Sequence, residues 1–198
     1  MKFLIGLILA IQSFTFVHAD ERCAKAEWVL DYVKTISDFP SQGFTFKWYS
    51  PLLKDPVAFK RVIHIFADRY RDSGIDAIVG LDSRGFIWGS ALAYELNIPF
   101  VVVRKAGKLP GEVISVKYDL EYGKDCFEIE KGILSPDQKV IIIDDVVATG
   151  GTINAAGKLI EQLGAQVHEV ACFIEISILK GREKIPYPVF SVIDTEGN

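Results

Sequence analysis

The chain has 198 residues, of which 49% are hydrophobic and 24% are charged, so it can bury one core and fits a single folded domain. Its formal net charge of −4 provides no basic surface of the kind that binds nucleic acid, and we expect no such partner. Three cysteines without a CxxC pair and three histidines without ligand-like spacing argue against a zinc site and against a Ser-His-Asp hydrolase.

The first 19 residues resemble a secretory signal. Met1 and Lys2 give a charged start, residues 3–11 are apolar, and Val17-His18-Ala19 has the spacing of a cleavage site. Three explanations fit this leader: a misassigned start codon, an uncleaved apolar arm that packs on the domain or on a dimer partner, or true export. The odd number of cysteines provides no extracellular disulfide framework.

Two helices are predicted next. The first runs from residue 21 to about residue 36, with Asp20 as its cap, and ends before Phe39-Pro40. The second opens at Asp55-Pro56, where an acidic cap precedes a proline, and ends near residue 73. Its apolar stripe predicts the side chains that face the core: Phe59, Val62, Ile63, Phe66 and Tyr70.

Alternating strands and helices follow. Strands are predicted at residues 77–81, 100–103, 140–143 and 167–174, and helices at residues 85–96 and 152–163. This series predicts an α/β fold with a doubly wound, mainly parallel sheet. Between residues 104 and 138 the pattern breaks into glycine, proline and charge, and residues 127–129 fit a short hairpin arm. Such a long excursion in a compact domain predicts a lid or a binding loop.

Two adjacent carboxylates and a glycine-hydroxyl loop follow the buried strand at residues 140–143. Ligands of open α/β sheets bind beyond the carboxyl ends of the strands, where we expect Asp144 and Asp145 to lie. The loop that leads into the next helix can bind a phosphate through its backbone N–H groups, its hydroxyls and the helix dipole. The acids would repel a bare phosphate but can accept hydrogen bonds from vicinal sugar hydroxyls, so the run predicts a sugar-phosphate site.

A second strand end carries Asp82-Ser83-Arg84. The start of the following helix and the Arg84 guanidinium can face a second anion. The spacing misses the G-x-S-x-G elbow by one residue and no histidine is well placed as a base, so we interpret Ser83 as a hydrogen-bond donor.

These motifs resemble those of the type I phosphoribosyltransferases, which bind 5-phosphoribosyl-1-pyrophosphate. Further segments are similar to the members of that family that act on adenine: residues 38–56, 80–86, 104–111, 118–124 and 179–184. The resemblance covers about residues 21–195. It implies a purine salvage enzyme that transfers the phosphoribosyl group to adenine, giving AMP and pyrophosphate. It also implies an N-terminal hood at residues 20–56 and a core at residues 57–198, with a mobile lid at about residues 105–126.

The resemblance implies a role for each motif. The ribose and 5-phosphate would be bound by Asp144, Asp145, Ala148, Thr149, Gly150, Gly151 and Thr152. Pyrophosphate would be bound by Asp82, Ser83, Arg84, Arg104, Lys105 and Lys108. Arg84 and Lys105 would act in catalysis together with Glu121, which handles a proton of the purine, and Tyr122 would belong to the lid. Mg²⁺ is expected as a cofactor held mainly by the substrate, without dedicated protein ligands.

The segment expected to recognise the base departs from the family pattern. Phe46 is expected to stack on the purine opposite Val146, and backbone groups near Thr45 and Lys47 are expected to read its exocyclic amine. However, Lys47 and Trp48 stand where the family usually has arginine and an acid. An enzyme for hypoxanthine, guanine or xanthine therefore stays open, as does a non-catalytic sensor of phosphoribosyl pyrophosphate.

Location and assembly rest on the resemblance. Family members are usually homodimers, so we expect a homodimer in which Arg104 acts across the interface. Because purines and phosphoribosyl pyrophosphate are intracellular, we expect a cytoplasmic protein with no stable membrane span in the mature domain. The leader keeps export open as the alternative.

Overall fold

The computed structural model describes residues 26–39, 41–43, 45–120 and 123–195. Seven strands form the central sheet in the order β5-β6-β4-β3-β7-β8-β9. Five of them, listed with their bounds, pair in parallel: β4 (Phe100–Lys105), β3 (Ala77–Leu81), β7 (Lys139–Val147), β8 (Gln166–Ile176) and β9 (Val189–Thr195). The hairpin of β5 (Val113–Leu120) and β6 (Gly123–Glu130) extends the sheet antiparallel beyond β4. The predicted doubly wound, mainly parallel α/β fold is confirmed.

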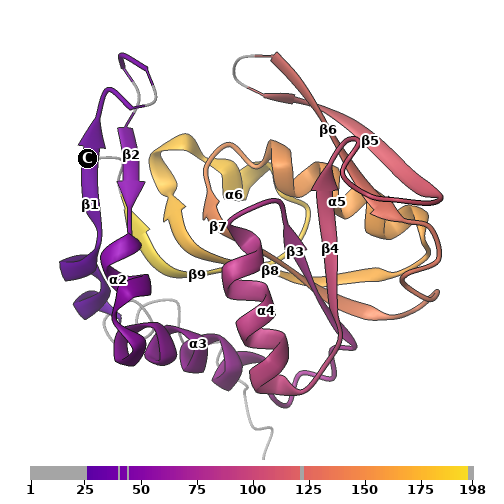
Figure 1. The fold of residues 1–198 in the computed structure, drawn as a ribbon, viewed down its shortest axis with the longest axis horizontal. Helices are drawn as coiled ribbons and strands as arrows, with labels where there is room; N and C mark the ends of the chain where they lie inside the picture. The colour runs from indigo at the N-terminus through magenta and orange to yellow at the C-terminus, as the bar shows by residue number, and fades with distance from the viewer. Residues whose placement is uncertain (1–25, 40, 44, 121–122, 196–198) are drawn as a thin grey trace, which may run out of the picture.

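Helices cover both faces of this sheet (Figure 1). The helices α3 (Pro56–Tyr70) and α4 (Gly85–Leu96) pack on one face, where Phe66, Trp88 and Phe173 are buried. The opposite face is covered by α5 (Gly151–Gln162), through Leu159 and Ile160. Successive residues of β7 belong alternately to the two cores, as expected for a strand that is buried on both sides.

The start of α3 follows its sequence signals. The Asp55 carboxylate caps the helix by accepting hydrogen bonds from the backbone N–H groups of Val57 and Ala58 at 2.9 and 3.1 Å. The predicted core-facing stripe is confirmed for Val62, Ile63, Phe66 and Tyr70, while Phe59 is only partly buried. The acidic cap and the proline at residues 55–56 therefore predicted the start of α3 correctly.

The predicted helix at residues 21–36 is wrong over its described part. The chain forms a 3-10 helix, η1 (Glu27–Tyr32), and then the strand β1 (Lys34–Ser37). That strand pairs antiparallel with β2 (Thr45–Trp48), and the pairing outweighs the helical spacing of the apolar residues. Ile36, which the helix would have carried near its end, is 40% exposed on β1.

Several other elements were missed or shortened in the sequence interpretation. Within residues 104–138 the chain forms a hairpin with two eight-residue strands, β5 and β6, where only a short arm was predicted. Further elements that were not predicted are β2, α2 (Ser50–Lys54), η2 (Ser177–Leu179), α6 (Gly181–Lys184) and β9. In Figure 1 the β1–β2 pair and the β5–β6 hairpin flank the end of the molecule toward which β7 points. Across the described ranges, every helix is too short or too polar to cross a membrane.

Candidate active site

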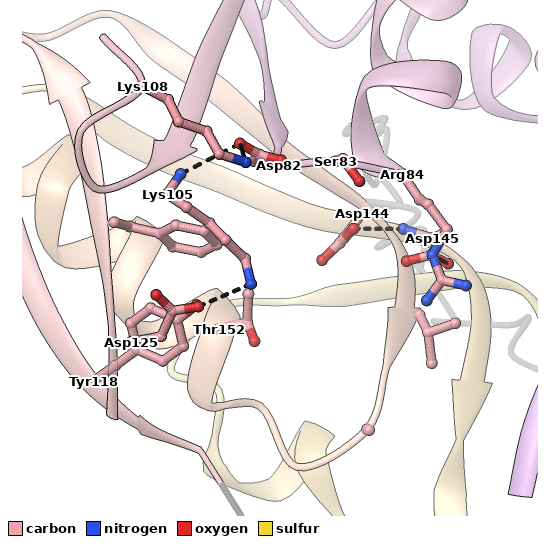
Figure 2. A pocket seen from close by; sticks show the side chains of 13 residues that line it. Asp82, Ser83, Arg84, Lys105, Lys108, Tyr118, Asp125, Asp144, Asp145 and Thr152 are labelled. Atoms are coloured by element: carbon pink, nitrogen blue, oxygen red, sulfur yellow. Dashed lines mark hydrogen bonds and ion pairs between the residues drawn. The ribbon is translucent and has the colours of Figure 1, made fainter. Parts of the chain in front are cut away.

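A pocket of about 580 Å³ opens where β3 and β7 end. Ten of its thirteen lining residues were predicted as site residues: Asp82, Ser83, Arg84, Lys105, Lys108, Asp144, Asp145, Val146, Ala148 and Thr152. The other three are Tyr118, Asp125 and Phe127, which the hairpin contributes. Tyr118 and Asp125 fall within the predicted lid, but none of the three was predicted as a binding residue. Figure 2 shows Lys105, Lys108, Asp82 and Asp125 on one side of the pocket, and Asp144, Asp145 and Arg84 on the other.

The two adjacent acids lie within β7 and not beyond its end. The strand was expected to stop at residue 143, but it continues to Val147 because β8 also continues and pairs with it as far as Glu175. Neighbouring residues of a strand point to opposite faces, yet both Asp144 and Asp145 line the pocket. Asp144 is half-buried, and Asp145 is only 4% exposed.

The environment of Asp144 disfavours its negative charge. Burial and the neighbouring charge of Asp145 raise the pKa of the Asp144 carboxyl well above its usual value. The backbone N–H of Asp145 donates to Asp144 Oδ1 at 2.8 Å and acts in the opposite direction. A ligand hydroxyl that donates to this pair would relieve part of the repulsion, as a vicinal diol of a sugar can do.

Asp145 is held by two donors on one oxygen. Arg84 Nε lies 2.8 Å from Asp145 Oδ2, and the Tyr49 hydroxyl donates to the same oxygen at 3.0 Å. The guanidinium of Arg84 also lies over the ring of Phe46, 4.9 Å from its centroid. Arg84 thus joins β7 to the N-terminal β1–β2 pair while it lines the pocket predicted for pyrophosphate.

The loop from Ala148 to Thr152 turns β7 into α5. Gly150 has a φ of +84°, a left-handed conformation that favours glycine, and it is the residue before the first turn of α5. Gly181 of α6 packs directly on this loop, since a Cβ at that position would collide with the carbonyl oxygen of Ala148. The contact with α6 was not predicted, although residues 179–184 stood out in the sequence.

The basic residues predicted for pyrophosphate converge on acids. Asp82 accepts from Lys108 Nζ at 3.1 Å and from Arg104 Nε at 3.2 Å, and Lys105 Nζ pairs with Asp125 at 3.0 Å. Partial burial acts to raise the pKa of Asp82, but these donors outweigh it and hold the pKa below its usual value. The cations therefore surround the pocket in an ordered arrangement that an incoming anion can share.

The predicted base-binding residues lie on β2. The ring of Phe46 contacts Phe39 edge-on at 5.2 Å between centroids and Trp48 at 6.2 Å. Lys47 points away from these rings: it is 5% exposed, its ammonium donates to Thr35 Oγ1 at 3.2 Å, and burial lowers its pKa. Thr45, Phe46 and Lys47 do not line the described pocket, and Val146 does. The stacking of a purine between Phe46 and Val146 stays a prediction.

The two residues predicted for the lid, Glu121 and Tyr122, lie outside the described residues. The strand β5 ends just before them and β6 begins just after them. From the same hairpin, Tyr118 reaches the pocket and packs its ring on Phe127 at 4.9 Å. Of the other predicted residues, Arg104, Thr149, Gly150 and Gly151 adjoin the pocket lining in sequence but are not part of it.

Among the described residues, no three acids, histidines or cysteines come close enough together to hold a metal ion. The carboxylates around the pocket instead stand in pairs with cations or with each other.

The chain is similar in sequence to known phosphoribosyltransferases. The family model for the phosphoribosyl transferase domain matches residues 49–198. The adenine phosphoribosyltransferase of Roseiflexus castenholzii is 49% identical over 164 residues, which are 82% of this chain and 95% of that protein. The chain belongs to the adenine phosphoribosyltransferase family.

Solved structures of the family share the fold. The enzyme from Saccharomyces cerevisiae, complexed with an imino-altritol bisphosphate and adenine, has a TM-score of 0.82 at 42% identity, covering 86% of this chain and 99% of that chain. The enzyme from Trypanosoma brucei, in complex with AMP, pyrophosphate and ribose-5-phosphate, has a TM-score of 0.78 at 32% identity, covering 90% and 82%.

Proposed function

We propose that the protein transfers the 5-phosphoribosyl group of phosphoribosyl pyrophosphate to adenine, giving AMP and pyrophosphate. The observation that carries the proposal is the pocket at the end of β7, where paired acids, a glycine loop at a helix start and a group of cations face one another. Relatives that carry the adenine phosphoribosyltransferase name, and a family structure that holds the nucleotide and pyrophosphate, support it.

Each part of the pocket has a role in this proposal. The 5-phosphate lies against residues 148–152, and the ribose hydroxyls donate to Asp144 and Asp145. Arg84, Lys105 and Lys108 take up the charge of the departing pyrophosphate, with Asp82, Ser83 and Arg104 supporting them. The purine stacks on Phe46 opposite Val146, where Thr45 and Lys47 read its edge through backbone groups.

The chemistry is a displacement at C1 of the ribose. The purine nitrogen bonds to C1 as the bond from C1 to the pyrophosphate oxygen breaks, and positive charge develops on the sugar. The acids of β7 stabilise that charge, and the cations across the pocket stabilise the leaving group. Glu121 handles the proton of the purine imidazole, and the predicted lid, to which Tyr122 belongs, closes over C1 to exclude water.

Mg²⁺ belongs to this proposal as a cofactor carried by the substrate. The pocket has four carboxylates, Asp82, Asp125, Asp144 and Asp145, beside its cations. A highly charged phosphoribosyl pyrophosphate would meet less repulsion there if Mg²⁺ offset part of its charge. The residues present fit an ion held mainly by the substrate, and Asp144 and Asp145 would bind the ribose hydroxyls.

The direct test offers each purine in turn. The protein is incubated with phosphoribosyl pyrophosphate, Mg²⁺ and adenine, hypoxanthine, guanine or xanthine, and the products are identified by mass. We expect AMP as the main product. Predominance of another nucleotide would assign the enzyme to that base. This outcome is tested because Lys47, which stands where the family usually has arginine, donates to Thr35. Binding of phosphoribosyl pyrophosphate without any nucleotide formed would indicate a sensor.

We propose a homodimer in the cytoplasm as the working form, with Arg104 near the partner's site. Light scattering of the purified protein tests the assembly against a chain mass of 22.0 kDa. Intact-mass analysis of native protein tests the location. A chain that begins at Asp20 and is recovered outside the cytoplasm would instead support export.

A further inference from the structure

Tyr49 stands between the N-terminal strands and the proposed ribose site. It follows β2 directly and is only 4% exposed. Its ring packs against Phe173 of β8 and Trp88 of α4, at centroid distances of 5.0 and 5.7 Å, and those two rings stack on each other at 4.5 Å. With its ring fixed in this cluster, the Tyr49 hydroxyl has one orientation relative to β7.

That hydroxyl donates to Asp145 Oδ2 at 3.0 Å, on the oxygen that Arg84 Nε approaches to 2.8 Å. Arg84 and the carboxylate that it contacts differ in exposure. The Arg84 side chain is 42% exposed and lies at the pocket, whereas the Asp145 side chain is 6% exposed. Arg84 is therefore free to turn toward a ligand, but Asp145 is not free to follow it.

The proposed reaction requires the Arg84 guanidinium to contact the pyrophosphate as well as Asp145. When pyrophosphate enters, the guanidinium is drawn from Asp145 toward the more negative ligand. Without a second donor, the nearly buried Asp145 carboxylate would then be strongly destabilised, and it could rotate or take up a proton. Either change would remove the acceptor that the ribose hydroxyl requires.

We infer that Tyr49 is a positioning residue whose hydroxyl holds the Asp145 carboxylate in its ribose-binding orientation when Arg84 turns to the pyrophosphate. This inference rests on the proposed function, because it requires Asp145 to bind the sugar and Arg84 to bind the leaving group. It gives the hydroxyl of Tyr49 a role that the packing of its ring would not require.

The chain contains a matched control. Tyr70 donates to Glu169 Oε2 at 2.8 Å, and Arg69 forms an ion pair with that carboxylate. Tyr70 is 2% exposed, and neither it nor Glu169 lines the pocket. Tyr70→Phe therefore removes the same type of hydrogen bond, from phenol to a buried carboxylate with an arginine, without touching the site.

The test compares Tyr49→Phe with Tyr70→Phe by calorimetric titration, using phosphoribosyl pyrophosphate with Mg²⁺ as one ligand and AMP as the other. AMP lacks pyrophosphate, so Arg84 can stay on Asp145 while AMP is bound. Loss of a hydrogen bond to a charged group corresponds to roughly ten-fold weaker binding. We expect that loss for phosphoribosyl pyrophosphate in Tyr49→Phe, with less than about three-fold for AMP. In Tyr70→Phe we expect neither affinity to change.

Steady-state kinetics provide a second readout. In Tyr49→Phe the KM for phosphoribosyl pyrophosphate should rise while kcat at saturation stays within about two-fold, and both variants should lose similar thermal stability. Equal losses for both ligands, no loss for either, or the same loss in Tyr70→Phe would overturn the inference. Failure of the proposed function is distinguishable, because wild-type protein would then form no AMP from adenine whatever the variants bind.

Discussion

The acid pair of β7 shows how a binding residue can work against the fold. Burial and the adjacent charge of Asp145 raise the pKa of Asp144 well above its usual value. An acid in this situation lowers the stability of the folded protein at pH values above its unfolded pKa, and the loss is complete once the pH exceeds the raised folded pKa. Asp144 therefore opposes folding at neutral pH, although it is proposed to bind the sugar.

Asp144→Asn should accordingly stabilise the protein and weaken substrate binding. We expect a gain of about 1 to 2 kcal/mol in the free energy of unfolding at pH 7. The gain should vanish below about pH 4, where the aspartate of the unfolded chain is itself protonated. Thermal melting across this pH range measures it.

The same variant should bind phosphoribosyl pyrophosphate at least about ten-fold more weakly, because an amide is a poorer acceptor than a carboxylate. Asp68→Asn, which removes an exposed acid of α3, is the control and should change neither quantity. If Asp144→Asn were less stable than the wild type at pH 7, the charge of Asp144 would not destabilise the folded protein.

Glu121 carries the proposed proton chemistry. Glu121→Gln should lower kcat by about a hundred-fold or more, the usual contribution of general acid–base catalysis, with little change in the affinity for phosphoribosyl pyrophosphate. Single-turnover measurements of AMP formation, alongside calorimetric titration, separate the two effects. Unchanged turnover would remove Glu121 from the mechanism.

Individual site residues could be predicted where a local motif carried them. Asp144, Asp145 and the loop to Thr152 are consecutive, so one strand-turn-helix pattern revealed them together. Tyr49 could not be found in this way, because its hydrogen-bond partner lies 96 positions further along the chain. Asp125 was hidden for a similar reason, since its partner Lys105 is brought close only by the hairpin.

Among the elements, the short helix α6 supports the phosphate loop. It packs Gly181 against the backbone of Ala148 and Gly150, and Arg182 fixes it to β8 through Glu175, with a hydrogen bond of 2.8 Å from Nε to Oε1. Arg182 also donates to the carbonyl oxygen of Val189 at the start of β9. The loop therefore depends on a helix about thirty residues downstream of it in the sequence.

Gly181→Ala should displace the phosphate loop. The new Cβ meets backbone atoms of the loop, which cannot move without shifting residues 148–150. We expect kcat/KM for phosphoribosyl pyrophosphate to fall by at least about ten-fold, since small displacements of positioning groups are costly to catalysis. Steady-state kinetics at fixed adenine measures this effect.

Gly157→Ala in α5 provides the control for that variant. The three atoms nearest to its Cβ would all belong to the Tyr187 side chain and none to the phosphate loop, so kcat/KM should stay close to that of the wild type. A Gly181→Ala enzyme as active as Gly157→Ala would contradict the supporting role of α6.

The elements that the sequence predicted well are those with strong internal signals. The strand cores of β3, β4, β7 and β8 are apolar runs, and α3 carries its own cap and proline. The others depend on partners. β1 is a strand because it pairs with β2, and the hairpin of β5 and β6 is long because its two strands pair with each other and β6 pairs with β4. These strand partners cannot be identified from the sequence of a single segment.

At the scale of the whole molecule, the strand order assembles the site. The sheet places β7 directly beside β3, although β4 and the hairpin separate them in the sequence, so the carboxyl ends of these two strands meet. The sequence predicted parallel strands but not this order, which depends on how the layers pack. With the order in place, the acids of β7 face Lys105 and Lys108 across the pocket, and Arg84, which follows β3, lies beside Asp145 (Figure 2).

In the proposed function, the end of β7 binds a phosphoribosyl group whose purine lies against Phe46. A crystal structure of the protein with AMP is the decisive experiment. We expect the 5-phosphate within hydrogen-bond distance of the backbone of residues 148–152, the ribose hydroxyls on Asp144 and Asp145, and the adenine ring on Phe46. A nucleotide bound elsewhere, or one whose sugar lies away from the two acids of β7, would contradict it.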